Sequence, residues 1–262
     1  MKLRSIIDDK KKAKVRDAIA KGDTSIFGKK KKGAEEPAFL LEKLVIKKQK
    51  IAPELQAELN KQLLYHVAKN DIEKVKEALV NGADINTEGP VLGNDTRVYL
   101  GEYTALLIAA LENNADMVRL LLANGANADV RDEFGLTIMM HAAREGCLEA
   151  VKILFLKVRD VDDMDNGERT ALMFAAGNGN VKVAEFLLSK GADINRNGRN
   201  GTALYNAAVN GKMEMVDFLV SNGADVNAKV DGSTILAHVM CTGKCQHIER
   251  CLLLHGAREW IL

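Results

Sequence analysis

Between residues 104 and 254 the hydrophobic positions come in pairs of short runs, and the polar positions around them repeat at an almost constant interval. One copy reads ERTALMFAAGNGNVKVAEFLLSKGADIN, residues 168 to 195, in which a Gly-containing break separates two apolar runs. A threonine opens each copy, and successive threonines lie 33, 33, 32 and 32 residues apart. They are Thr104, Thr137, Thr170, Thr202 and Thr234. A fixed period of this length indicates a repeat protein.

Each copy predicts two helices. The threonine is a good N-cap, because its hydroxyl accepts a hydrogen bond from the first helical turn. An Ala-Ala pair five and six residues later makes a thin face, against which a neighbouring helix packs closely. A glycine nine residues after the threonine, such as Gly146 or Gly179, ends the first helix, and apolar residues at helical spacing predict the second. One such pair cannot bury its apolar face alone, so the repeats predict a stacked solenoid.

The threonines, paired alanines, turn glycines and closing Gly-Ala-Asp phrases together resemble ankyrin repeats, whose units consist of a β-turn finger and two helices. The resemblance covers residues 61 to about 257 in six units, and it implies an all-α ankyrin-repeat solenoid with β-turn fingers. We therefore expect an ankyrin-repeat domain over residues 61–262, whose last unit is a C-terminal cap. Trp260 and Ile261 are expected to cover the open end of its core.

Three features depart from the family pattern. No unit has the proline of the family's Thr-Pro-Leu-His phrase, and the family's Thr–His hydrogen bond is not expected because other residues hold the histidine position. These are Leu107, Met140, Met173, Tyr205 and Ala237. VRDVD replaces the closing phrase at residues 158–162, where Val158 disfavours a positive φ, and this predicts a bend or weak point. An insertion between Gly82 and Thr104 predicts either a lengthened hairpin finger or a spacer.

The first sixty residues form a basic segment, with 16 Lys+Arg against 9 Asp+Glu in a chain whose net charge is +1. KVRDAIAKGD at residues 14–23 aligns with KVKEALVNGAD at 74–84, which predicts two degenerate repeats; a flexible basic arm followed by a helical cap is the alternative. Pro53 stands where the first position of a helix is expected. Lys29–Lys32 is a short charge run typical of a solvated loop. Binding of nucleic acid or anionic lipid through these lysines is the alternative.

Composition excludes several classes of protein. A hydrophobic content of 47% excludes a wholly disordered chain, and an aromatic content of 5% favours thin layers of small aliphatic residues over one large core. No apolar run has the length of a signal peptide, or the roughly 18 residues of a membrane span. We therefore expect a cytoplasmic, intracellular protein, and we expect it to be monomeric. With only four cysteines, no disulfide framework is expected.

Catalytic motifs are missing from the sequence: it has no Gly-rich phosphate loop, no G-x-S-x-G and no H-E-x-x-H. We therefore expect neither enzymatic activity nor a cofactor. One cluster has enough residues of the right types for a tetrahedral zinc site. Its members are His238, Cys241, Cys245, His247, Cys251 and His255. The spacing argues against zinc, because Cys251 stands at an inward-facing helix position, where cysteine acts as a small hydrophobe.

The resemblance implies a non-catalytic protein–protein interaction module that binds an unidentified partner protein through the concave face and the fingers. In the family, contacts come from finger residues before each threonine and from helix positions seven and eight after it. The fingers offer Tyr103, Glu133, Phe134, Leu136, Asn166, Arg169, Arg199, Val230, Asp231 and Ser233. The helices offer Leu111, Glu112, Arg144, Glu145, Asn178, Val209, Asn210 and Thr242. Tyr103 and Phe134 are the strongest candidates, because exposed finger aromatics have no role in the core and aromatic residues dominate binding hot spots.

Overall fold

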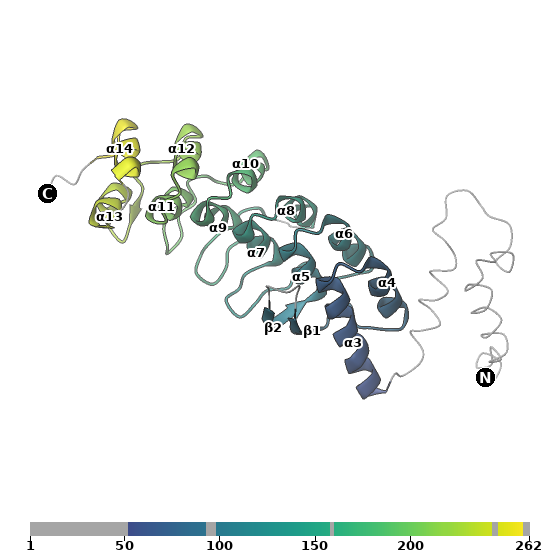
Figure 1. Ribbon diagram of the computed structural model, residues 1–262. Helices are drawn as coiled ribbons and strands as arrows, with labels where there is room; N and C mark the ends of the chain where they lie inside the picture. Colours follow the sequence, from purple (N-terminus) through teal and green to yellow (C-terminus); the bar gives the residue numbers. More distant parts are fainter. Residues whose placement is uncertain (1–51, 93–97, 158–159, 243–245, 259–262) are drawn as a thin grey trace, which may run out of the picture.

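The structure is a computed structural model that describes residues 52–92, 98–157, 160–242 and 246–258. Over these residues the chain forms six helix pairs stacked in one elongated row, as Figure 1 shows. The pairs are α3 (Pro53–Ala68) with α4 (Ile72–Val80), α5 (Ala105–Leu111) with α6 (Ala115–Ala123), α7 (Ile138–Glu145) with α8 (Leu148–Phe155), α9 (Ala171–Asn178) with α10 (Val181–Ser189), α11 (Ala203–Val209) with α12 (Met213–Ser221), and α13 (Ile235–Thr242) with α14 (Gln246–Leu254). The predicted solenoid is confirmed.

The first helix of each unit, called the inner helix, begins after its repeated threonine from α5 to α13, as predicted. Each threonine hydroxyl accepts a hydrogen bond from the backbone N–H three residues later, at 3.2 or 3.3 Å. In α7 the sulfur of Met140 also accepts a bond from the backbone N–H of Thr137, at 3.4 Å. Methionine at the family's histidine position therefore still takes part in capping this helix.

In the first five units, the turn between the two helices contains one residue in the left-handed conformation. Gly146 and Gly179 end α7 and α9 with φ values of 77° and 81°, as predicted. The first two pairs have Asn70 and Asn113 there, with φ values of 56° and 50°. Asparagine tolerates this conformation better than most residues with a side chain, so the same turn forms without glycine.

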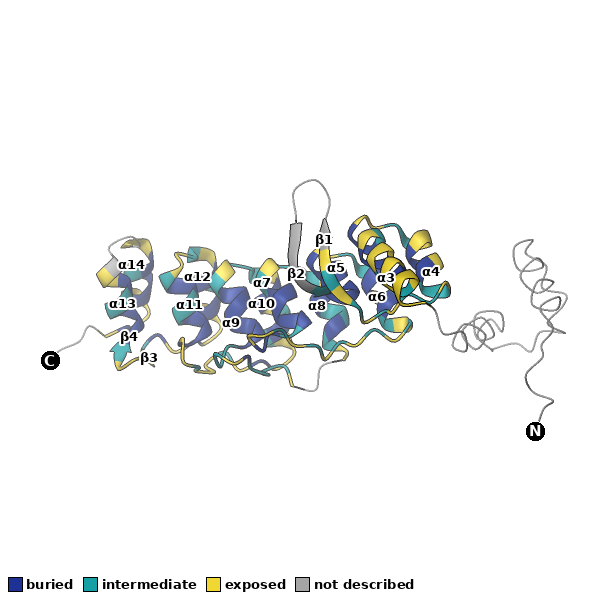
Figure 2. Cartoon of the chain, turned by 90° about the horizontal axis from the view of Figure 1, so that it is seen from below, coloured by how far each residue is buried: buried dark blue, intermediate teal, exposed yellow. Residues whose placement is uncertain are grey.

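The core lies between the inner helices and the second, outer helices. Inner helices pack on the inner helices of neighbouring units, and outer helices on outer helices. Figure 2 shows the resulting line of buried residues along the whole row. The paired alanines, such as Ala142 and Ala143, are buried, and so are leucines of the outer helices, such as Leu154 and Leu187. Thin layers of small residues form this core, in keeping with the low aromatic content.

The insertion before Thr104 forms a β-hairpin, which was one of the two predicted alternatives. Strand β1 (Glu88–Leu92) pairs antiparallel with β2 (Val98–Thr104). The hairpin packs on α3, where a Cβ on Gly89 would lie 3.3 Å from the side chain of Leu64. A second, shorter hairpin forms in the last finger, between β3 (Lys229–Val230) and β4 (Ser233–Thr234).

Polar side chains link the closing turn of one unit to the next. The side-chain oxygen of Asn195 accepts a hydrogen bond from the N–H of Asp225 at 2.8 Å. Asn86 and Asn227 make the same bond to the units that follow them, at 2.8 and 2.9 Å, and Asp162 makes it at 2.9 Å. These bonds form a ladder along one edge of the stack.

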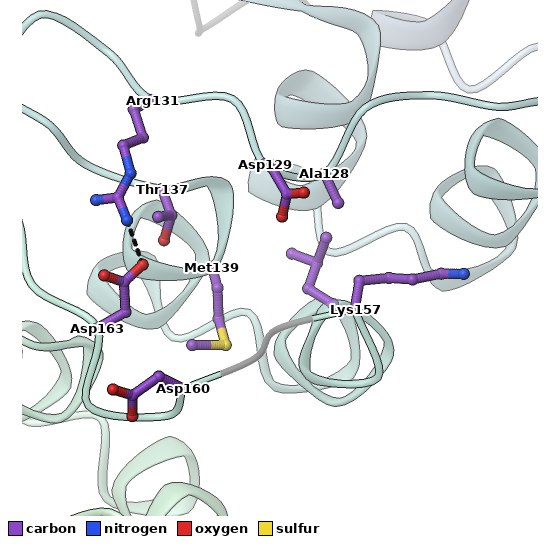
Figure 3. A pocket seen from close by; sticks show the side chains of 9 residues that line it. Ala128, Asp129, Arg131, Thr137, Met139, Lys157, Asp160 and Asp163 are labelled. Carbon is purple, nitrogen blue, oxygen red and sulfur yellow. Dashed lines mark hydrogen bonds and ion pairs between the residues drawn. The ribbon is translucent and has the colours of Figure 1, made fainter.

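The ladder is interrupted where VRDVD replaces the closing phrase. The corresponding bond here would join the side chain of Asp129 to the backbone N–H of Asp160. Both residues lie in the described part of the chain, and no hydrogen bond joins them. Arg131 bridges this junction instead: its guanidinium donates to the backbone carbonyls of Gly135 and Met164 at 3.0 Å each and pairs with Asp163 (Figure 3). The hydrogen bond to Asp163 is the main reason that the pKa of Arg131 is raised. A hollow of about 400 Å³ lies beside these side chains.

Several predictions concern residues outside the described ranges and stay predictions. They concern Val158, Cys245, Trp260, Ile261 and the lysine run Lys29–Lys32. The organisation of residues 1–51 also lies outside these ranges. Helix α3 starts at Pro53, as predicted, and runs across residue 60, the predicted last residue before the repeat domain.

Candidate functional site

A groove of about 820 Å³ lies between the β1–β2 hairpin and the fingers that precede α7 and α9, and we call it the hairpin groove. It brings together residues of three consecutive units, from Glu88 in the hairpin to Phe174 in α9. The predicted contact residues that line it are Tyr103, Glu133, Phe134, Leu136, Arg144 and Arg169. These six side chains form the best-defined candidate site.

Asp132 holds the finger that carries Glu133 and Phe134. Its Oδ1 accepts hydrogen bonds from the backbone N–H groups of Phe134 and Leu136, at 2.9 and 2.8 Å. Its Oδ2 lies 2.9 Å from Nε2 of His141 on α7. One carboxylate therefore both shapes the finger and ties it to the inner helix, which fixes where the Phe134 side chain is presented.

His141 lies buried against the groove, with its pKa lowered mainly by burial. The charge of Arg144 adds to this lowering, whereas the hydrogen bond to Asp132 and the charge of Glu145 oppose it. The Nη2 atom of Arg144 lies 3.4 Å from Nδ1 of His141. A neutral ring suits both contacts, because Nε2 then donates to Asp132 while Nδ1 accepts from Arg144.

Two phenylalanines of the groove are in contrasting environments. Phe134 is 61% exposed at the finger. Phe174, at the position on α9 that corresponds to His141 on α7, is buried beneath the guanidinium of Arg169, 4.6 Å from the ring centroid. Arg169 is itself held by buried Asp165, with N···O distances of 2.6 and 2.8 Å. One aromatic ring of the groove is therefore covered by an arginine, and the other is open.

Three predicted contact residues present little surface to a partner. Leu111, Leu136 and Val230 are only 8%, 4% and 5% exposed. Each is an apolar side chain at a helix end or finger base that turns into the stack, so burial removes it from water. Leu136 contributes to the groove only as part of its wall.

A second hollow, of about 400 Å³, lies one unit further along. The predicted contact residues that line it are Arg169, Arg199, Val230 and Asp231. Tyr205 also lines it, and its pKa is raised by burial and by the charge of Asp231. Neither hollow is lined by Leu111, Glu112, Glu145, Asn166, Asn178, Val209, Asn210 or Ser233. The side chain of Thr242 lies outside the described part of the chain.

Several residues that line the groove are absent from the predicted contact set, among them Glu88, Asp132, His141 and Phe174. His141 and Phe174 both stand four residues after the threonine, whereas the predicted helix contacts stand seven and eight residues after it. Glu88 begins the inserted hairpin, and its place beside the finger depends on a fold that local patterns do not specify. The role of Asp132 in shaping the finger could have been predicted, because aspartate often accepts hydrogen bonds from backbone N–H groups within its own turn.

The cysteines and histidines that are close in sequence near the C-terminus have different surroundings in the structure. Cys251 is buried, its Sγ lies 3.1 Å from a carboxylate oxygen of Asp217, and burial raises the pKa of its thiol to about 11. Cys241 is exposed, and His238 packs edge-on against Tyr205. Within the described ranges, no three His, Cys, Asp or Glu side chains are placed to hold a metal ion together.

The stacked helix pairs with their fingers define the class of protein, a repeat solenoid. Residues 37–132, 63–165 and 106–198 match a family model described as ankyrin repeats (3 copies), and residues 182–220 match one described as ankyrin repeats (many copies). These matches span well over half of the chain, and the protein belongs to the ankyrin repeat family. Ankyrin repeats are typically protein–protein interaction modules, and the family is usually non-catalytic.

Among the helices of the described residues, none combines the length and the apolar character that crossing a membrane requires.

Proposed function

We propose that this chain is a non-catalytic binding module that holds a partner protein against its concave face and fingers, as a monomer in the cytoplasm, with the hairpin groove as the centre of the contact. The proposed contact residues are the accessible members of the predicted set. They are Tyr103, Glu112, Glu133, Phe134, Arg144, Glu145, Asn166, Arg169, Asn178, Arg199, Val209, Asn210 and Asp231.

The exposure of Phe134 carries this proposal. A phenylalanine that is 61% exposed leaves an apolar ring in water, although the finger beneath it is fixed by Asp132. A fixed finger loses little conformational freedom when a partner covers it, so the apolar contact contributes to affinity with little entropic loss. Aromatic and arginine side chains also form most binding hot spots, and both line this groove.

Site-specific crosslinking tests the proposal. We would replace Phe134 with the photoreactive benzoylphenylalanine in the full chain, irradiate it in a lysate of its source cells and identify the adducts. Leu156 is a matched control, because it is also a large apolar residue, is 78% exposed and does not line the groove. We expect a discrete protein adduct from position 134 that is absent from position 156.

The substitutions Phe134→Ala and Leu156→Ala complete the design. The first is expected to reduce capture of the crosslinked protein by at least about tenfold, the range of a hot-spot residue, and the second to leave it unchanged. Equal adducts from both positions, or equal capture by both alanine variants, would contradict binding at the groove.

A further inference from the structure

The chemistry of the hairpin groove indicates which kind of partner it fits. This inference rests on the proposed function and deepens it, because it asks what the partner segment must carry. The relevant features are the charges that line the groove and the one aromatic ring that is left open there.

The arginines of the groove already have carboxylate partners within the fold. Arg131 pairs with Asp163, and Arg169 pairs with buried Asp165. Arg144 lies 3.4 Å from the carboxylate of its neighbour, Glu145. These cations therefore leave little positive charge for a partner to meet.

The acids of the groove are less compensated. Glu88 and Glu133 are exposed, and within the described part of the chain neither side chain has an ion-pair partner. The contact of Asp132 is with a histidine whose pKa is lowered, so that contact brings no full positive charge near pH 7. The groove consequently has an excess of negative charge beside the open ring of Phe134.

The fold itself shows what completes such a site. One unit further along, a guanidinium lies over Phe174 and is held by the carboxylate of Asp165. Phe134 has neighbouring carboxylates from Asp132 and Glu133, and no cation of the described residues lies over its ring. Cation–π contact backed by a carboxylate favours arginine, whose planar guanidinium stacks on a ring and donates in a fork.

The charge of the wider molecule acts in the same direction. Residues 52–262 carry 21 Lys+Arg against 29 Asp+Glu. A net negative body with acids in a groove attracts positively charged segments and raises their association rate.

We infer that the hairpin groove binds an arginine-bearing basic segment of the partner protein, with one guanidinium seated on Phe134 between Glu133 and Glu88. The residues that determine this preference are the ring and the two glutamates. Arg144 and Arg169 also line the groove and would repel a second cation placed beside them.

A defined probe tests this without knowledge of the partner. Fluorescence anisotropy of the full chain would be measured with three labelled nonapeptides, in which glycine alternates with arginine, lysine or glutamate. We expect the arginine peptide to bind at least about threefold more tightly than the lysine peptide, because only a guanidinium can stack on the ring and donate two parallel hydrogen bonds to a carboxylate. The glutamate peptide is expected not to bind.

Three variants locate the binding. Phe134→Ala is expected to weaken the arginine peptide about fivefold, the scale of an exposed cation–π contact, and Glu133→Gln about threefold. Glu214→Gln is the matched control and should change nothing, because Glu214 is an exposed glutamate on outer helix α12 that forms no ion pair with any described residue. Equal losses in Glu133→Gln and Glu214→Gln, or none in Phe134→Ala, would mean diffuse attraction and overturn the inference.

The chain's own basic segment is the competing occupant, since residues 1–51 carry 16 Lys+Arg against 7 Asp+Glu. A full chain with Lys29, Lys30, Lys31 and Lys32 all changed to Gln decides this. Unchanged affinity for the arginine peptide supports the partner assignment, whereas a severalfold gain would assign the groove to this segment and overturn it.

The two proposals can fail separately. If position 134 crosslinks a protein but the arginine peptide does not bind, the choice of partner chemistry is wrong and the proposed function stands. If the peptide binds at Phe134 but no protein is crosslinked there, the proposed function fails.

Discussion

A finger aspartate has a different third contact in two neighbouring units. Asp132 and Asp165 each accept hydrogen bonds from two backbone N–H groups of their own finger. The remaining oxygen faces His141 in one unit and Arg169 in the next. The difference follows the residue four positions after the threonine. In the first of these units this residue is His141, which contacts Asp132. In the next unit it is Phe174, which cannot bind an aspartate and packs beneath Arg169. The backbone turn is thus retained while the surface presented to a partner changes.

The buried His141 makes stability depend on pH. Its folded-state pKa lies below the ordinary value of 6.5, mainly because of burial, so the unfolded chain binds more protons as the pH falls through that value. Stability is therefore expected to fall as the pH drops from 7.5 to 5.5. His141→Gln keeps a donor for Asp132 but does not titrate, so it should lose less over this range. Urea unfolding at both pH values checks this, and equal losses would contradict it.

Charged groups around the imidazole set the size of this effect. Asp132 and Glu145 favour the protonated ring and Arg144 disfavours it. The other histidines of the chain are present in both proteins, so the comparison cancels their contribution.

Glu168 is expected to reduce stability through its backbone conformation. It has a φ of 60°, at the finger position where Gly135 and Gly232 have φ values of 80° and 81°. A residue with a Cβ costs about 1–2 kcal/mol in the left-handed region, so Glu168→Gly should stabilise the protein by about 1 kcal/mol. Glu168→Gln is the control, because both variants lose the ion pair with Arg199 but only the first relieves the backbone. Urea unfolding measures the difference, and a glycine variant no more stable than the glutamine variant would show that no strain is present.

At the scale of elements, helices and turns were predictable from the sequence because their causes are local. The threonine caps and the left-handed glycines act within a few residues, and both were confirmed in α7 and α9. The inserted hairpin could be predicted as one of two alternatives, because its turn residues and apolar run are also local signals. Contacts between units were not predictable, because the bond from Arg131 to Met164 spans 33 residues and depends on how units stack. Likewise, nothing local distinguishes buried Leu136 from exposed Phe134, two positions earlier on the same finger.

Arg131 is expected to compensate for the missing ladder bond between Asp129 and Asp160. It donates to the backbone carbonyl of Gly135 within its own finger, and across the junction it donates to the carbonyl of Met164 and pairs with Asp163. Lysine carries its donors on a single atom and lacks the fork that spans these three acceptors, so Arg131→Lys should lower the free energy of unfolding by about 1–2 kcal/mol. Arg119→Lys is the control, because Arg119 forms only an exposed ion pair within α6, and urea unfolding should show a change of less than about 0.5 kcal/mol. Equal effects of the two substitutions would show that the bridge adds no stability.

At the scale of the whole molecule, each helix pair contacts mainly the pairs beside it. The core is a continuous line rather than a single centre, which Figure 2 shows as buried positions along the row. Stability of such a stack is close to a sum of unit terms and interface terms between neighbours. An interior unit contributes to two interfaces and a terminal unit to one, so the same substitution is expected to have different consequences in the two places.

Leu187 in α10 and Leu252 in α14 test this difference, because both are fully buried leucines of outer helices. Leucine-to-alanine changes at such sites cost about 2–5 kcal/mol locally. In the interior unit that loss weakens the stack on both sides, so Leu187→Ala should speed hydrogen exchange from α7 to α12 and lower the midpoint of urea unfolding. In the last unit the loss is confined, because α13 and α14 can open while the rest stays folded, so Leu252→Ala should speed exchange in these helices alone. Hydrogen exchange followed by mass spectrometry distinguishes the two patterns, and uniform acceleration of all helices by Leu252→Ala would mean that the row unfolds as a single unit.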